Sequence, residues 1–236
     1  ELPTPVNFGY RFEGWFENEN GTGQEFAYID AATLRNYEFY AKWYAIEMTV
    51  SFGSTTLTGD VLLVDLSQTK SIKTTLTIAD TVQEVTFCDL EYGDVKIIIS
   101  SRTQDLVIRL KDFESHESGM ENTHTIEVKG DSSFNLTIDY AGNNSISGTR
   151  YHFNDVEAYH GIYAPNCTVK FIQSVPGGSL NIRGGYGGIR SGGETGTAGT
   201  LETKGGRGGD ASDGPQGGSA VYANKIIIEN CTGLSF

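Results

Sequence analysis

Histidines and carboxylates gather in one short stretch of the sequence, which contains His152, Asp155, Glu157 and His160. Such side chains could bind a metal ion or exchange protons. On a single β-strand, however, side chains alternate between two faces, so the ends of this stretch would lie far apart. Neither a His-Glu-x-x-His motif nor a Cys/His ligand pattern accompanies it. We therefore expect no metal, no cofactor and no catalytic residue, and predict that the chain is not an enzyme.

Tyrosines alternate with polar side chains in the same region. Aromatic rings stack on the faces of sugar rings, and carboxylates accept hydrogen bonds from sugar hydroxyls. The candidate ligand-binding set is Tyr151, Asp155, Tyr159 and Tyr163, with Tyr186 added from a glycine-rich segment farther along. Half-buried packing of these tyrosines within a β-sheet remains the alternative.

Charge and hydropathy exclude several classes of partner. The 236 residues carry a formal net charge of -13, with 17 basic side chains against 30 acidic ones. This balance argues against binding to nucleic acid or to an anionic membrane surface. No apolar run approaches the roughly 20 residues that span a bilayer, so no membrane insertion is expected. The three cysteines form no Cys-x-x-Cys pair, which predicts buried free thiols.

The elements that must position these residues are predicted to be strands. Only Ala31 to Arg35 could make a helical turn, whereas β-branched and aromatic residues dominate elsewhere. Short runs with alternating apolar residues recur roughly every ten residues. We expect strands over Leu57–Val64, Val85–Phe87, Val95–Ile99, Leu106–Leu110, Ile126–Val128, Phe134–Ile138, Val169–Ile172, Leu180–Ile182 and Ile226–Ile228.

A weak internal repeat favours one β architecture over another. The segment Gly161 to Asn166 precedes one apolar run in the way that Ala220 to Asn224 precedes another. A turn followed by a strand, repeated, is typical of the rungs of a parallel β-helix. We therefore predict an elongated right-handed parallel β-helix, with a β-sandwich as the alternative.

Glycine concentrates between residues 177 and 218 and recurs there with a period of three. Three residues per turn is the repeat of polyproline-II-type helices, in which a glycine at each turn lets neighbouring backbones approach closely. The period breaks at Asn181, Arg190, Glu202 and Ala211, which indicates turns. The sequence predicts a glycine-rich lobe over 177–218, with a flexible glycine-rich loop as the alternative.

The N-terminal region contains three sequence motifs that follow one another closely. It reads Leu2-Pro3-Thr4-Pro5, then Gly9-Tyr10-Arg11-Phe12-Glu13-Gly14-Trp15-Phe16, then Phe39-Tyr40-Ala41-Lys42-Trp43. Residues 2–43 resemble the second half of the Listeria-Bacteroides repeat, the internalin-type B-repeat. The resemblance implies a small β-grasp-like module, found in large bacterial surface proteins and without enzymatic activity. The aromatic residues of this pattern are expected to form the core of the module.

Two domains are predicted: a partial B-repeat-like module over 1–45 and a β-solenoid domain over 46–236. The resemblance implies an extracellular, cell-surface or cell-wall-associated location. The expected function is a non-catalytic bacterial surface module of the adhesin type, or one that presents a structural surface, with a host or matrix protein or a cell-surface glycan as partner. A carbohydrate-binding module is the first alternative. A polysaccharide lyase or glycoside hydrolase built on a β-helix is the second, and it would require two convergent carboxylates.

Overall fold

The computed structural model describes residues 1–29, 36–51, 53–69, 73–115, 123–149, 159–185 and 218–236. Every regular element in these ranges is a β-strand, and none is a helix. The prediction of an all-β chain is confirmed. The segment Ala31 to Arg35, the one place where a helical turn was expected, lies outside the described residues.

The N-terminal residues form a small antiparallel sheet. Its strands are β1 (Arg11–Phe16), β2 (Glu25–Phe26) and β3 (Tyr40–Tyr44), in the order β2-β1-β3. The ring of Phe12 meets Trp15 and Trp43 edge to face, with centroids 5.6 Å and 5.5 Å apart. Such contacts supply the apolar area that a sheet of this size needs.

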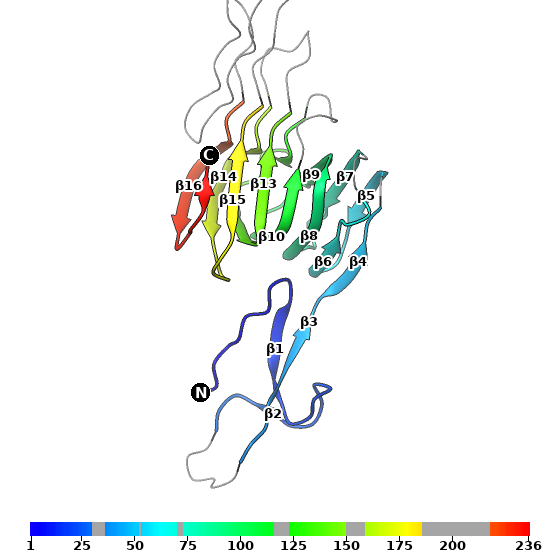
Figure 1. Cartoon of the computed structure of the whole chain (residues 1–236), viewed down its shortest axis with the longest axis vertical. Helices are drawn as coiled ribbons and strands as arrows, with labels where there is room; N and C mark the ends of the chain where they lie inside the picture. Colours follow the sequence, from blue (N-terminus) through cyan, green and yellow to red (C-terminus); the bar gives the residue numbers. More distant parts are fainter. Residues whose placement is uncertain (30–35, 52, 70–72, 116–122, 150–158, 186–217) are drawn as a thin grey trace, which may run out of the picture.

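The remaining strands form one 14-stranded sheet in which every pairing is parallel (Figure 1). Its strands are β4 (Ile46–Thr49), β5 (Gly53–Leu57), β6 (Val61–Asp65), β7 (Thr74–Ile78), β8 (Glu84–Gly93), β9 (Val95–Ile99), β10 (Leu106–Ser115), β11 (Ile126–Val128), β12 (Asn135–Ala141), β13 (Asn143–Ser147), β14 (Ile162–Ile172), β15 (Ser179–Arg183), β16 (Val221–Glu229) and β17 (Leu234–Ser235).

The pairings divide this curled sheet into three walls. Wall 1 contains β5, β7, β9, β11 and the first parts of β14 and β16. Wall 2 contains β4, β6, the first parts of β8 and β10, β12, and the later parts of β14 and β16. Wall 3 contains the ends of β8 and β10, then β13, β15 and β17. The chain visits the walls in this order and then returns to wall 1, so the fold is β-helix-like. Parallel pairing favours this reading over the sandwich, whose sheets are antiparallel.

The core consists of ladders of apolar side chains that stack from one turn of the chain to the next. Along the strands buried and partly exposed residues alternate, as in BiBiB for β7 and β9, because successive side chains point to opposite faces. One ladder in wall 2 is Leu62, Val85, Ile108, Ile138 and Phe171, and one in wall 1 is Leu76, Ile97, Ile126, Ile162 and Val221.

One predicted strand is two separate strands in the structure. The run from Leu57 to Val64 is not a single strand, because β5 ends at Leu57 and β6 begins at Val61. Gly59 between them has a φ of 137°, and the Asp60 carboxylate accepts a hydrogen bond from the N–H of Val61 at 2.9 Å. The positive φ and this local hydrogen bond make a bend that moves the chain from wall 1 to wall 2.

The corner between walls 2 and 3 uses backbone conformations that few residues adopt. Asp89, Asp112 and Gly142 stand there with φ values of 59°, 52° and 68°. Beside them Asn144 is only 4% exposed; its Oδ1 accepts the N–H of Phe113 at 3.0 Å, and its Nδ2 donates to three backbone carbonyl oxygens. A buried amide therefore satisfies backbone groups that the bend removes from the sheet.

Charged side chains join the N-terminal sheet to wall 2. Arg11 of β1 pairs with Asp60 at 3.1 Å and with Glu84 at 3.7 Å. Arg109 on β10 also pairs with Glu84, at 2.5 Å, and its Nε lies 3.4 Å from the buried carboxylate of Asp139. These contacts form a continuous row of alternating charge that runs from the small sheet across the large one.

Candidate functional site

Two of the five predicted ligand-binding residues lie in the described part of the chain. Tyr163 points outward from wall 1 on β14, between the buried Ile162 and Ala164. Tyr159 lies just before this strand and meets the His124 ring edge to face, with centroids 5.2 Å apart. Tyr151, Asp155 and Tyr186 lie outside the described residues. The structure thus places Tyr159 and Tyr163 beside the same histidine, and their contact with a ligand stays a prediction.

Tyr163 belongs to a stack of four rings that crosses successive turns of the chain. Its ring lies 4.4 Å from the ring of His124 at an angle of 9°, and 5.5 Å from the ring of Tyr222 at 11°. His160 stacks on the other three rings, with centroids 5.2 Å, 5.6 Å and 5.1 Å from His124, Tyr163 and Tyr222 respectively. We call His124, His160, Tyr163 and Tyr222 the ring stack.

Sequence reasoning missed His124 and Tyr222 as members of this group. The signal was present, because the repeat that aligns Gly161 with Ala220 also aligns Tyr163 with Tyr222, and the two tyrosines are register partners in the sheet. Within the stack the ring faces cover one another. Tyr222, in the last turn of the chain that the structure describes, is the most open member, with 44% of its surface exposed.

Both histidines of the ring stack accept backbone hydrogen bonds from the following turn. Nδ1 of His124 accepts the N–H of His160 at 2.9 Å, and Nδ1 of His160 accepts the N–H of Ser219 at 2.8 Å. An Nδ1 that accepts must be unprotonated, so these bonds require the tautomer that carries hydrogen on Nε2. Burial, and to a smaller extent the neighbouring His160, lower the pKa of His124 to about 3. His124 is therefore neutral at physiological pH.

The ring stack marks the corner at which the chain returns from wall 3 to wall 1. We call this the return corner; its described residues are 123, 148–149, 159–161, 184–185 and 218–219. Cross-turn hydrogen bonds tie these residues together. The N–H of Thr149 donates to Thr123 O at 3.3 Å, that of Gly185 to Tyr159 O at 2.8 Å, and that of Gly218 to Gly185 O at 2.9 Å. Residues 123, 149, 159, 185 and 218 at this corner are the neighbours in sequence of segments 116–122, 150–158 and 186–217, which lie outside the described residues.

Glycines at the return corner allow backbone to lie against backbone. A Cβ on Gly184 would overlap the carbonyl oxygen of Gly218, and one on Gly148 would overlap that of Tyr159. Gly184 belongs to the three-residue glycine frame, as does Gly178, whose Cβ would come within 2.8 Å of Gly142 O. The close approach predicted for glycine is found at these two positions. The rest of the predicted lobe, from residue 186 to residue 217, lies outside the described residues.

A second candidate site is an acidic groove at the corner between walls 2 and 3. The groove encloses about 520 Å³ and is lined by Asp89, Glu91, Asp112 and Glu114, together with the exposed Tyr92. Asp89 and Asp112 occupy equivalent positions in adjacent turns, since their neighbours Cys88 and Lys111 are register partners. The described lining includes neither Lys nor Arg. Such a groove attracts cations and accepts hydrogen bonds from hydroxyl groups.

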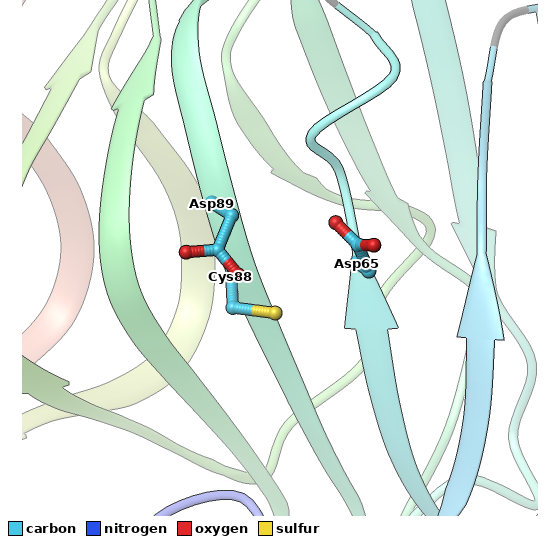
Figure 2. Close-up of side chains that lie close together, drawn as sticks. All are labelled: Asp65, Cys88 and Asp89. Carbon is cyan, nitrogen blue, oxygen red and sulfur yellow. The ribbon is translucent and has the colours of Figure 1, made fainter.

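Next to this groove Asp65, Cys88 and Asp89 bring one possible metal-ligand atom each within 4.8 Å of one another. Figure 2 shows Asp65 at the end of β6, facing the Cys88 sulfur on β8. Burial and the carboxylate of Asp89 raise the pKa of Cys88 to about 12, so the thiol is protonated at neutral pH. Because the thiolate is the form that binds metal, a metal ion bound here would have to displace this proton.

Comparisons with protein-family models, with curated proteins and with solved structures find no match to this chain. In the part of the chain that the structure describes, no helix is long and apolar enough to cross a membrane.

Proposed function

We propose that this chain is a non-catalytic surface module of the adhesin type, which displays parts of its chain from one corner of a right-handed parallel β-helix. The right hand follows from the strong preference of parallel strand connections for that sense. The partner is a host or matrix protein or a cell-surface glycan. The bacterial, extracellular setting rests on the B-repeat resemblance of residues 2–43.

One observation carries the proposal: three segments of the sequence each adjoin described residues of the return corner. They lengthen along the chain, from 116–122 through 150–158 to 186–217. The described residues of this corner are held by backbone hydrogen bonds, by glycines in close contact and by the ring stack. A stacked parallel sheet is a rigid support for such segments, in the way that loops on a fixed scaffold carry recognition in many proteins.

The test replaces one segment and leaves its support intact. Because the N–H of Gly218 donates to Gly185 O at 2.9 Å, an Asn-Gly linker can close the gap left by deleting 186–217. We expect the variant to keep its melting temperature. We also expect it to lose binding to whichever of immobilised fibronectin, laminin or collagen the whole chain binds. A second variant that replaces 116–122 tests another of the three segments.

Two outcomes would contradict the proposal. If the whole chain binds none of the three matrix proteins and no glycan on an array, adhesin-type binding is ruled out. If binding persists unchanged after 116–122, 150–158 and 186–217 have each been replaced, recognition does not occur at the return corner.

A carbohydrate-binding module is the second candidate, and the exposure of Tyr222 favours it. The ring stack ends at Tyr222 in the described part of the chain, and this tyrosine offers an accessible aromatic surface on which a sugar ring can stack. A glycan array compared between the whole chain and Tyr222→Ala would show loss of sugar binding in the variant. Equal binding by the two proteins would exclude this tyrosine from the site.

A further inference from the structure

Three consecutive connections between walls 1 and 2 line an open cavity of about 830 Å³. Asp80 lies between β7 and β8, residues 101–104 lie between β9 and β10, and residues 131–133 lie between β11 and β12. The connections stack because the strands that flank them are paired in register on both walls. The cavity is therefore built by the regular repeat of the fold, and it lies at a different corner from the ring stack.

One of the residues that line this cavity is Arg102, which is only 5% exposed. Its Nε donates to Gln104 O at 2.7 Å, and its Nη2 donates to Val82 O at 2.7 Å and to Asp105 O at 3.0 Å. The guanidinium also lies over the Phe134 ring, 5.6 Å from its centroid. These contacts fix the orientation of the side chain.

One nitrogen of this fixed guanidinium has no partner. Nη1 of Arg102 is buried and makes no hydrogen bond, and it is the only buried side-chain nitrogen or oxygen in the described residues of which this is true. A buried donor without an acceptor destabilises the folded chain, and the cost is larger when the donor is charged. An oxygen atom supplied by a bound molecule would remove that cost.

The other polar groups of the cavity limit what this molecule can be. The exposed carboxylates of Asp80 and Asp131 line it, and hydroxyl groups are contributed by Ser101 and Ser133. Two carboxylates against one guanidinium disfavour an anion, and the guanidinium disfavours a metal ion. A hydroxyl group suits both kinds of partner, because it accepts from Arg102 and donates to a carboxylate.

We propose that this cavity binds a neutral sugar, with one hydroxyl accepting a hydrogen bond from Nη1 of Arg102 and neighbouring hydroxyls donating to Asp80 and Asp131. Carbohydrates present several such hydroxyls on adjacent carbons, and the cavity volume lies within the range of small-molecule sites. This site lies at a different corner from the ring stack. A negative result for sugar binding here would therefore not contradict the proposed adhesin function.

The test is a titration of the isotopically labelled whole chain, followed by nuclear magnetic resonance. Glucose, galactose, mannose and N-acetylglucosamine are added separately, and sodium sulfate is added in its own experiment. We expect saturable shifts for at least one sugar in the amides of Ser101, Thr103 and Ser133 and in the Nε–H of Arg102. Sulfate should leave these signals in place.

Variants separate a sugar site from a general surface effect. Asp131→Asn changes an exposed side chain, so the fold should persist, and it should weaken sugar binding about 10-fold by removing a charged acceptor. Asp89→Asn, in the acidic groove at another corner, is the matched control and should bind as the unchanged chain does. Arg102→Lys tests the donor directly; if it unfolds, Asp131→Asn still decides the question.

Three results would overturn the proposal. The first is the absence of shifts with every sugar. The second is a response to sulfate that equals or exceeds the response to sugar, which would make the cavity an anion site. The third is equal sugar affinity in Asp131→Asn and in the unchanged chain.

Discussion

Nδ1 of His124 accepts the backbone N–H of His160, one turn farther along the chain, at 2.9 Å. His160 repeats this contact with the N–H of Ser219 at 2.8 Å. The parallel ladders of backbone hydrogen bonds are interrupted at the return corner. There the Nδ1 atoms of two histidines, instead of carbonyl oxygens, accept the backbone N–H groups. The stability of this corner consequently depends on the protonation state of its histidines.

The free energy of unfolding should fall when the pH drops below the pKa of a histidine in the unfolded chain. The pKa of His124 is lowered to about 3 in the folded chain, whereas an unfolded histidine has a pKa of about 6.5. Between these values the unfolded state binds a proton that the folded state does not. The contribution of His124 is therefore fully present above about pH 6.5 and is lost as the pH falls toward 3.

Urea unfolding at several pH values measures this effect. His124→Asn removes the titrating group and places an amide oxygen near the position of Nδ1, where it can accept the N–H of His160. Its stability should therefore vary less with pH than that of the unchanged chain, by on the order of 3 kcal/mol across this window. Parallel curves for the two proteins would mean that His124 does not carry the acid sensitivity.

Asn144→Ala should be one of the most damaging substitutions of a polar residue. It removes the acceptor of the Phe113 N–H and the donor to three carbonyl oxygens at a buried bend. We expect a loss of about 2–4 kcal/mol in the free energy of unfolding. Asn181→Ala, on the partly exposed side of β15, is the control and should change stability by less than about 1 kcal/mol. Similar losses at the two positions would contradict the role assigned to Asn144.

Asp139→Ala should destabilise the chain far more than the loss of a surface carboxylate. Asp139 is 1% exposed and accepts hydrogen bonds from the N–H and the hydroxyl of Ser174, at 2.9 Å and 2.6 Å. Its removal leaves Arg109 with one carboxylate partner fewer in a partly buried site. We expect a cost of about 3 kcal/mol by thermal or urea unfolding.

The ion pair of Lys170 and Glu229, 2.8 Å apart and with side chains 33% and 50% exposed, provides the contrast to Asp139. Exposed ion pairs contribute about 0–1 kcal/mol. Glu229→Ala should accordingly leave the melting temperature nearly unchanged. A large effect there, or a negligible one for Asp139→Ala, would show that burial does not set the energetic ranking of these carboxylates.

Two glycines should respond differently to alanine. In Gly184→Ala the new Cβ would overlap the backbone of Gly218, so two turns of the chain must move apart. Gly177 has a φ of 90° and would have nothing within 4 Å of a Cβ, so its replacement costs backbone strain alone. We expect losses of more than about 2 kcal/mol at Gly184 and about 1–2 kcal/mol at Gly177. Thermal unfolding measures both losses. If Gly177→Ala were the more destabilising of the two, the return corner would tolerate the separation of its two turns.

Much of the secondary structure followed from the sequence. Val95–Ile99 and Ile126–Val128 were predicted with the bounds they have in the structure, because alternation of apolar and polar residues is a local property of a strand with one buried face. Bends were less predictable. The split of Leu57–Val64 depended on Gly59, whose positive φ is only one of the conformations that a glycine can adopt.

The candidate sites depended on register, which no local pattern specifies. Tyr163 and Tyr222 were visible as repeat partners, but the stacking of His124 between turns required the pairing of β11 with β14. The cavity around Arg102 likewise gathers residues from three connections that are separate in sequence. Sequence alone determined that strands form and which side of each is apolar, since those properties reside in neighbouring residues. Only the tertiary structure decided which turns lie against each other, because parallel pairing joins residues tens of positions apart.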